Sequence, residues 1–534
     1  MGIHPSGSMK RLNTAQKIDK ICNLLLILCV SAFLFFMTIM SFLFTQRCGR
    51  EAWGEIENGV PIYQIWDNPS YHLAGILLLF AFFASIFRLR ARIGDRMLQG
   101  FQIGIALTAV LFSCLIFLGG QRTPINDQVQ VYSAASLFNQ GNYVNLTKGG
   151  YLDMYPQQLG FVAYLQILFR IFGNENFAAV QALNCLWIGG LVFMLCRILN
   201  ELTMDNALRL AGSLLFLFQL PLFLLNCWVY GDVPGLFFLS LAFLHYLRYG
   251  KDGKRQRFLF MALSMCMSLI FRKNCLIGIL AMCIAMLFRG LRSRRPAMLI
   301  AALLVLLLPC GVTKGIELYY QQVSGHSIDG GLPASMWIAM GMSEDSSNPG
   351  WFSNYCVPLY YSADCDRDAA SQTAVRDIQA KLSLFLEDPV YGVSFYKRKL
   401  CTQWNDPFYN TNFLIATDGE SRGITGCLLA LEDGFLLSFL SVFQFLNYCG
   451  LFLYCVGPAR KKYTDENMLL IFFLGGVLFS LLWEANSRYI YPYILLSMPL
   501  SAIGWAGIWG KAKASIQNTM AKNTLLFTGW GKHN

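Results

Sequence analysis

The feature that most constrains this chain is a series of apolar runs, most of them long enough to cross a bilayer. Inside a bilayer, no water satisfies the backbone, so a run of about 20 residues must form a helix to cross. Twelve runs fit this description, at residues 21–44, 72–88, 101–118, 177–197, 206–226, 232–249, 257–271, 273–289, 297–316, 434–456, 465–484 and 488–508. The sequence therefore predicts an all-α polytopic membrane protein with about twelve transmembrane helices.

Composition agrees with this prediction. Of the 534 residues, 55% are apolar and only 14% are charged, against about 25% charged in an average soluble domain. These values exclude an ordinary soluble enzyme and a disordered or fibrous chain. The first run is too long for a signal-peptide core and no small-residue cleavage site follows it, so we expect an uncleaved anchor.

The charges predict how the chain is oriented. With the N-terminus in the cytoplasm, the inner segments hold 25 of the 42 basic residues and only seven of the 31 acidic residues. Cytoplasmic loops of membrane proteins carry this excess of Lys and Arg. We therefore expect a multi-pass protein of the plasma (cell) membrane with both termini cytoplasmic. The net charge of +11 is then a topology signal, and we expect no nucleic-acid partner.

Four parts follow from this topology. They are residues 1–98 with two spans, 99–316 as a core containing the outer loop 119–176, 317–433 as an outer capping region, and 434–534 with the last spans and a short cytoplasmic tail.

The outer segments contain further predicted helices, at 128–140, 156–172 and near 370–386. The second is amphipathic. If it crossed the membrane, every later basic loop would lie on the outer side, which the charge rule disfavours. We therefore predict a juxtamembrane helix that lies on the outer membrane surface.

Cysteine and histidine suggest no metal chemistry. The five histidines are scattered, and none lies at the spacing of a zinc site. Four cysteines fall in the outer capping region, namely Cys356, Cys365, Cys401 and Cys427. Spacing alone leaves two alternatives open, a Cys356–Cys365 disulfide or free thiols. No Walker A motif is present, which argues against ATP-driven transport.

Three carboxylates lie at the outer ends of predicted spans. Asp127 follows the third span, and a carboxylate held there with little water has the raised proton affinity of a general base. The alternative is that Asn126 or Asp127 caps the helix that follows. Asp232 is likewise a helix cap or a site residue, and Asp153 is a site residue or a solvated loop acid.

Three cations lie on the same side. Arg272 and Lys273 occupy the outer turn of a tight hairpin, where the charge rule disfavours them, and Arg488 opens the last span. A lipid phosphate would explain all three. For Arg488 the alternative is a salt bridge to Glu484, four residues earlier.

At these residues the chain resembles the GT-C superfamily of membrane glycosyltransferases. Within it the chain is most similar to the PMT-like branch, which includes protein O-mannosyltransferases and aminoarabinose transferases. Four short motifs carry the resemblance, over roughly residues 99–300 and 465–510, and they are Asn126–Asp127, Tyr155–Leu159, Gly231–Pro234 and Ser487–Pro492.

The resemblance implies a GT-C-like fold and a transferase without nucleotide cofactor or catalytic metal. Such an enzyme moves a sugar from a polyprenyl-phosphate donor to a hydroxyl of a glycan, lipid or protein on the outer face, with inversion. Asp127 would be the catalytic base. The substrate-binding residues would be Asp153, Tyr155, Gln157, Asp232, Arg272, Lys273 and Arg488.

Two other functions stay open. One is a transporter or flippase, and the other is a glycan polymerase or ligase that uses the same lipid carriers. Transporters place charged groups near the bilayer midplane, whereas the charges of this chain cluster at the ends of its runs. That pattern favours an enzyme over a transporter.

Overall fold

The computed structural model describes residues 14–49, 61–120, 123–293, 296–344, 348–415, 423–457 and 464–530. Of the protein, 81% is helical, so the predicted all-α class is correct. The described strands form one small antiparallel hairpin, in which β1 (Phe44–Cys48) pairs with β2 (Ile62–Trp66).

Eight helical segments are long and apolar enough to cross a membrane. They comprise α1 (Thr14–Leu43), α2 (Pro69–Arg88), α3 (Asp95–Gly119), α7 (Phe177–Leu202), α12 (Leu276–Ser293), α13 (Pro296–Ser324), α18 (Gly423–Leu431) continued through a π turn at Glu432–Leu436 into α19 (Leu437–Val456), and α21 (Ser487–Trp530). The protein is therefore an integral membrane protein by the length and composition of its helices.

A ninth span is formed if a bent pair crosses as one unit. This pair runs from α8 (Asn206–Leu215) into α9 (Leu220–Leu224) with a bend of 54°. The three remaining predicted positions also hold helices, α10 (Asp232–Asp252), α11 (Arg255–Phe271) and α20 (Asn467–Leu482), which are not among the eight. The total of twelve spans stays a prediction.

Small residues allow the long helices to approach closely. At the crossing of α19 and α21, a Cβ atom on Gly504 would clash with the backbone oxygen of Gly450. Near this crossing the indole nitrogen of Trp505 donates a hydrogen bond to the Leu446 carbonyl at 2.8 Å. Membrane helices pack in this way because lipid supplies no hydrophobic drive for their association.

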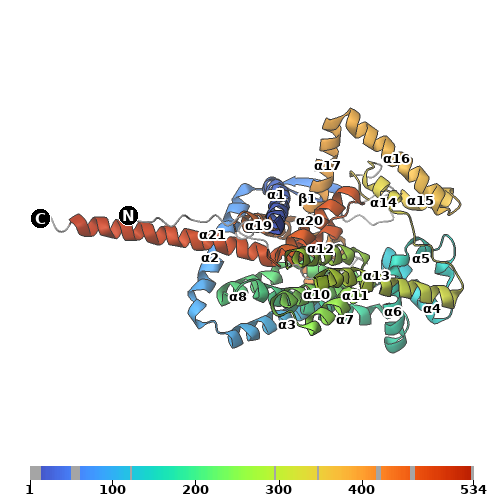
Figure 1. Ribbon diagram of the computed structural model, residues 1–534, viewed down its shortest axis with the longest axis horizontal. Helices are drawn as coiled ribbons and strands as arrows, with labels where there is room; N and C mark the ends of the chain where they lie inside the picture. The colour runs from blue at the N-terminus through green and yellow to red at the C-terminus, as the bar shows by residue number, and fades with distance from the viewer. Residues whose placement is uncertain are drawn as a thin grey trace, which may run out of the picture.

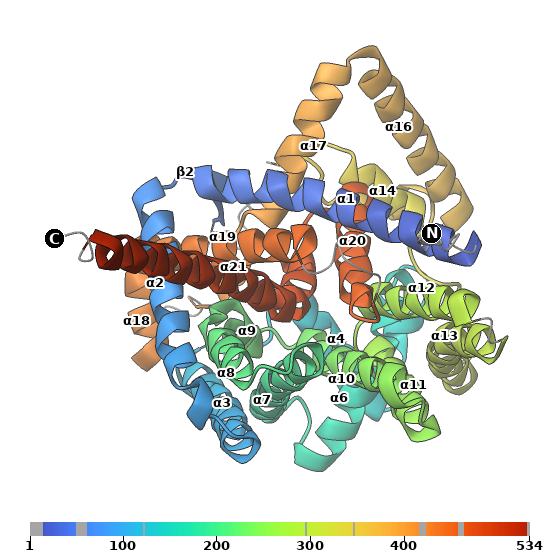
Figure 2. The same cartoon turned by 60° about the vertical axis from the view of Figure 1, so that its left-hand side comes forward.

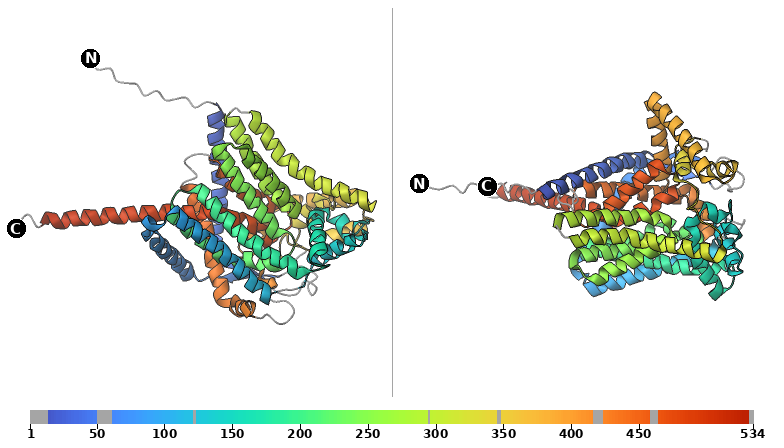
Figure 3. Two further views of the ribbon diagram at one scale, coloured as in Figure 1. Left: turned by 90° about the horizontal axis from the view of Figure 1, so that it is seen from below. Right: turned by 45° about the vertical axis from the view of Figure 1, so that its right-hand side comes forward.

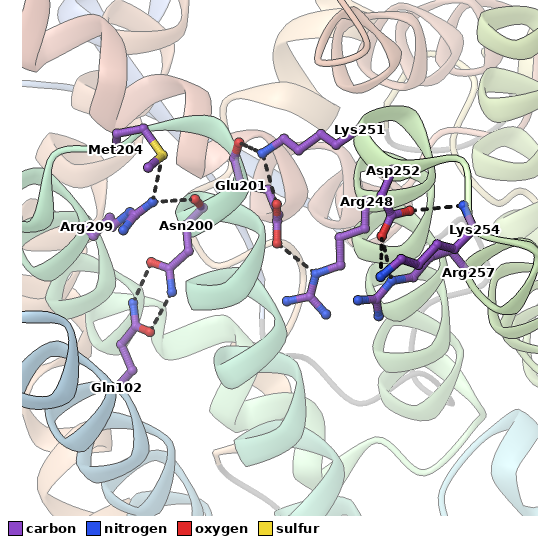
Figure 4. Close-up of polar contacts among 10 residues, drawn as sticks. All are labelled: Gln102, Asn200, Glu201, Met204, Arg209, Arg248, Lys251, Asp252, Lys254 and Arg257. Atoms are coloured by element: carbon purple, nitrogen blue, oxygen red, sulfur yellow. Dashed lines mark hydrogen bonds and ion pairs between the residues drawn. The ribbon is translucent and has the colours of Figure 1, made fainter.

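One end of the bundle gathers the basic loops. Glu201, at the end of α7, accepts from Arg248 at 2.7 Å and from Lys251 at 2.9 Å, as Figure 4 shows. Arg289 and Asp465 form a second pair at 3.0 Å. Arg289 also donates to the Gly250 carbonyl, so four of the segments that the charge rule assigns to the inner side, near residues 201, 250, 289 and 465, meet at one end of the bundle.

The opposite end carries the shorter helices (Figures 1 and 3). They are α4 (Asp127–Asn139), α5 (Tyr151–Met154), α6 (Leu159–Phe172), α14 (Ala334–Gly341), α15 (Cys356–Ser362), α16 (Arg367–Glu387) and α17 (Pro389–Trp404), with 3₁₀ turns at Val144–Leu146, Pro156–Gln158, Lys273–Cys275 and Asn412–Leu414. The helices expected near 128–140, 156–172 and 370–386 are all present.

The amphipathic helix α6 buries its apolar face against protein. It packs against α4, α11 and α13, and Val162 and Leu165 are fully buried. Its outer side still exposes Ile167, Ile171 and Phe172. Contact with the membrane surface stays a prediction, since the apolar face serves first to attach the outer loop to the bundle.

Candidate functional site

A cavity of about 410 Å³ opens at this end of the bundle, within the range of about 300–1,000 Å³ typical of ligand sites. Its walls come from the starts of α4 and α21, the turn before α6, the turn between α11 and α12, and the segment before α14. Six of the predicted site residues line it, namely Asp127, Tyr155, Gln157, Arg272, Lys273 and Arg488.

Asp127 is held at the cavity by a strained turn. Asn126 has φ 51° and ψ −132°, and the Gln128 amide donates to the Ile125 carbonyl at 3.0 Å. A residue with a side chain is rarely found in this conformation, which glycine adopts more readily. Asn126 occupies the capping position of α4 without a side-chain cap bond, and Asp127 is the first helical residue. The alternative that one of them serves as a helix cap is therefore not realised.

Gln128 fixes this turn to the next span. Its side-chain oxygen accepts a hydrogen bond from the Val229 amide at 2.8 Å, and the whole residue is buried. The start of α4 is thereby tied to the segment that leads into α10.

The Asp127 carboxylate faces the cavity and is open to it, yet protein surrounds it on its other sides. This loss of water raises the pKa of Asp127 above its usual range. The positive charges of Arg488 and Arg272 and a hydrogen bond from Tyr230 oppose that rise. A carboxylate with a raised pKa and access to a cavity is suited to accept a proton.

A second carboxyl group, Glu484, lines the same cavity. It lies in the short connection between α20 and α21 and is almost fully buried. Burial, followed by the nearby charge of Asp127, raises the pKa of Glu484 to about 8. At neutral pH, Glu484 is therefore mainly the neutral acid.

Arg488 stacks on an aromatic ring. Its guanidinium carbon lies 4.1 Å from the centre of the Trp228 ring. The Nε atom is buried without a hydrogen-bond partner. Among the described ion pairs there is none between Arg488 and Glu484, so the predicted alternative of a salt bridge is not formed. Arg488 also lines the cavity.

Asp232 lies behind the cavity wall. Its carboxylate pairs with Arg272 at 3.1 Å, and both side chains are 12% exposed. Arg272 also lies over the Tyr230 ring, 5.1 Å from its centre. Asp232 does not line the main cavity, so its position suits holding Arg272 in place rather than contacting a ligand there.

Asp153 is not brought to this cavity. Its carboxylate accepts from the Gly149 amide at 2.8 Å and from the Tyr360 hydroxyl at 3.0 Å. It lines a second cavity of about 500 Å³. Because α5 is a four-residue helix, Asp153 and Tyr155 project in different directions. Arg367 lines both cavities and therefore lies between them.

Sequence reasoning missed Lys399, which supports the Glu484 segment. This fully buried lysine of α17 donates to the carbonyls of Trp483 at 2.8 Å, Leu481 at 3.1 Å and Gly341. Two of these carbonyls close the C-terminus of α20, where backbone oxygens lack helical partners. Burial lowers the pKa of Lys399 to about 7, while its three acceptors match the three donors of the protonated form.

Sequence reasoning also missed the aromatic lining. Trp337 and Trp483 stack with ring centres 5.9 Å apart on the cavity wall, and the Tyr230 hydroxyl meets the Tyr151 hydroxyl at 2.5 Å. The only signal for these residues was their place beside span ends.

The described residues contain no group of three or more His, Cys, Asp or Glu that could hold a metal ion. Cys356, Cys365, Cys401 and Cys427 are free thiols, so the alternative disulfide is not formed. No protein-family model, curated protein or solved structure matches this chain.

Proposed function

We propose that the protein is a glycosyltransferase that takes a sugar from a polyprenyl-phosphate donor and attaches it to a hydroxyl acceptor. The observation that carries this proposal is one cavity that joins an accessible, poorly solvated carboxylate to two nearly buried guanidinium groups. Asp127 provides the carboxylate, and Arg272 and Arg488 provide the cations. A transfer in which a proton is removed and a phosphate leaves needs these two kinds of group.

The chemical step uses them in turn. Asp127 accepts the proton of the acceptor hydroxyl as its oxygen attacks the anomeric carbon. The bond between that carbon and the phosphate oxygen breaks, and its electron pair leaves with the lipid phosphate. Arg272 and Arg488 stabilise the growing charge on the phosphate, which is worth most where water is scarce. Attack from the face opposite the phosphate inverts the anomeric centre.

The position of the cavity suits a lipid-linked donor. Arg272 at the end of α11 and Arg488 at the start of α21 line it, so it lies at helix ends, where the phosphate of a membrane-embedded lipid would reach it. In our proposal this end is the outer face of the cell membrane and both termini are cytoplasmic. Three of the described ion pairs, Arg248–Glu201, Arg272–Asp232 and Arg289–Asp465, lie at helix ends or in loops, which supports an enzyme over a transporter with charges at the midplane. The pairs Lys314–Glu317 in α13 and Arg47–Glu432 at the π turn involve residues within candidate spans.

Binding of the leaving lipid tests the proposal without knowledge of the sugar. Undecaprenyl phosphate should bind the purified protein in nanodiscs, as measured by native mass spectrometry. Arg488→Ala should weaken binding by tenfold or more, about 1.4 kcal/mol. Arg488→Lys should restore only part, because a guanidinium binds phosphate through two parallel hydrogen bonds.

Equal binding by all three proteins would contradict the assignment of Arg488. Absence of binding by the wild-type protein would contradict a polyprenyl-phosphate carrier altogether.

A further inference from the structure

The helices α16 and α17 form a hairpin that leaves the bundle sideways. The end of α17 is anchored, since Phe395, Lys399 and Trp404 are fully buried and α17 packs against α1, α20 and α21. The turn between the two helices is not anchored. In Figure 1 and in the right-hand view of Figure 3, this tip lies beside the bundle and not beyond its end.

The tip exposes large apolar side chains from both helices. Leu386 is 81% exposed on α16, and Val390 and Val393 are 80% and 71% exposed on α17. Leu382 and Leu384 are exposed on the same arm. Protein surfaces in water rarely gather so many apolar side chains without a partner that covers them.

Charged and aromatic groups surround this apolar tip. Lys381 lies over the Tyr391 ring at 5.6 Å from its centre, and Arg376 and Lys397 are exposed nearby on the two arms. The turn itself holds two exposed acidic residues, Glu387 and Asp388, and the Asp388 carboxylate caps α17 by accepting from the Tyr391 amide at 3.0 Å. Basic and aromatic residues beside an apolar patch are typical of segments that lie in a membrane interface.

The surface below the hairpin is already a lipid-facing one. Helix α1 contacts α17, and in the right-hand view of Figure 3 it lies on the side of the bundle from which the hairpin projects; Figure 2 shows the two helices from another side. The membrane-crossing helix α1 exposes Leu24, Leu28, Phe35 and Ile39 along its length. The bilayer that covers these side chains therefore extends to the foot of α17, on the side toward which the hairpin projects.

We propose that the apolar tip of the α16–α17 hairpin inserts into the interface of the bilayer leaflet at the cavity end of the bundle. Leu386, Val390 and Val393 enter the lipid, and Lys381 and Lys397 remain among the headgroups. The hairpin thereby anchors the region that carries Lys399, and with it the wall of the cavity, to the membrane. This inference requires only the membrane-crossing helices and does not depend on the proposed function.

The test measures the depth of the tip in the full-length protein. A fluorescent amino acid is incorporated at position 386 by codon suppression, and the protein is placed in nanodiscs of phosphatidylcholine and phosphatidylglycerol. Lipids with a doxyl group on the upper acyl chain should remove most of the emission. A label at Leu28 serves as the membrane-embedded control, and a label at Gln372, exposed on the same helix, should keep its emission.

If the label at position 386 keeps its emission while that at Leu28 loses it, the proposal is overturned. Crosslinking of position 386 to a second copy, without quenching by lipid, would also overturn it and make the tip a dimer contact. The variant Leu386→Glu with Val390→Glu gives a second readout. In nanodiscs, the backbone amides of residues 382–393 should exchange hydrogen faster in this variant than in the wild-type protein. Equal exchange rates in the variant and the wild type would overturn the proposal.

Discussion

Asp127 and Glu484 line one cavity with opposite tasks. After burial, the negative charge of Asp127 raises the proton affinity of Glu484, since two negative charges in a poorly solvated space repel. The nearby guanidinium groups of Arg272 and Arg488 oppose the rise in proton affinity at both sites. With its pKa at about 8, Glu484 is mainly neutral at neutral pH, and in our proposal it therefore adds no negative charge beside the donor phosphate.

Asp127→Asn should abolish sugar transfer while leaving folding and donor binding nearly intact. General base catalysis contributes about 10²–10⁴ in rate, so a loss of that size is expected in a transfer assay. Asn at the same position keeps the shape of the side chain. If turnover stays near that of the wild type, the base lies elsewhere, and Asp153→Asn and Asp232→Asn are the matched comparisons.

Glu484 predicts a loss of activity at alkaline pH. Because the pKa of Glu484 is raised to about 8, the neutral form predominates below that pH, and a second negative charge appears beside the donor phosphate above it. The rate of transfer should therefore fall as pH rises through about 8. Glu484→Gln stays neutral throughout and should lack this alkaline decline. An unchanged pH profile in Glu484→Gln would assign the decline to another group.

The sequence indicated some of the residues that line the cavity and not others. Arg272 and Arg488 drew attention because each is a charge at the edge of an apolar run, and Asp127 because it follows the third run by nine residues. Glu484 was considered only as a partner of Arg488, since nothing in a single sequence shows that four elements enclose it. The different directions of Asp153 and Tyr155 depend on the phase of a four-residue helix, which no periodicity in the sequence reveals.

At the scale of the elements, hydropathy predicted the positions of the helices. It did not predict the contacts between helices that hold the cavity wall in place. The runs near α1, α3 and α7 are long and nearly free of charge, so their helices could be placed. Lys399 lies in a segment of ordinary polarity and is buried only because α17 docks against α20. Contacts of this kind join distant parts of the chain, so the local sequence pattern does not predict them.

The crossing of α19 and α21 should tolerate almost no added volume. Gly504→Ala places a methyl group against the backbone of Gly450 and should destabilise the protein by about 1–3 kcal/mol. Gly507→Ala on the same helix meets nothing within 4 Å and serves as the matched control. Thermal unfolding in detergent measures both. Equal melting temperatures would show that the two helices separate without cost.

At the scale of the whole molecule, the two ends of the bundle differ in what they hold. One end gathers paired basic loops around Glu201 and Asp465. The other holds both cavities, the hairpin and the aromatic lining. The charge rule predicts that the basic loops share one side of the membrane, and the assignment of that side to the cytoplasm stays a prediction. The number of crossings also stays a prediction, because α10 and α11 are not among the eight helices that are long and apolar enough.

Labelling from outside the cell should distinguish the two ends. In a variant without its native cysteines, a cysteine at Ser362 should react with an impermeant maleimide, and one at Ser293 should react only after the membrane is opened. Ser362 is exposed on α15, and Ser293 ends α12 at the other end. Ser346, an equivalent outer position in the predicted topology, lies outside the described residues. The reverse pattern would invert the topology and move the cavity to the cytoplasm.

The connection from residue 483 to residue 486 has a consequence for biosynthesis. It holds Glu484 and precedes Arg488, and it is fixed by partners made long before it, since the Ala485 amide donates to the Gly350 carbonyl at 2.7 Å and Ser487 donates to Asp406 at 2.6 Å. A ribosome delivers Asp127 357 residues before Glu484. A chain released before α20 and α21 enter the membrane therefore lacks a finished cavity, and in our proposal such a truncated copy cannot transfer sugar.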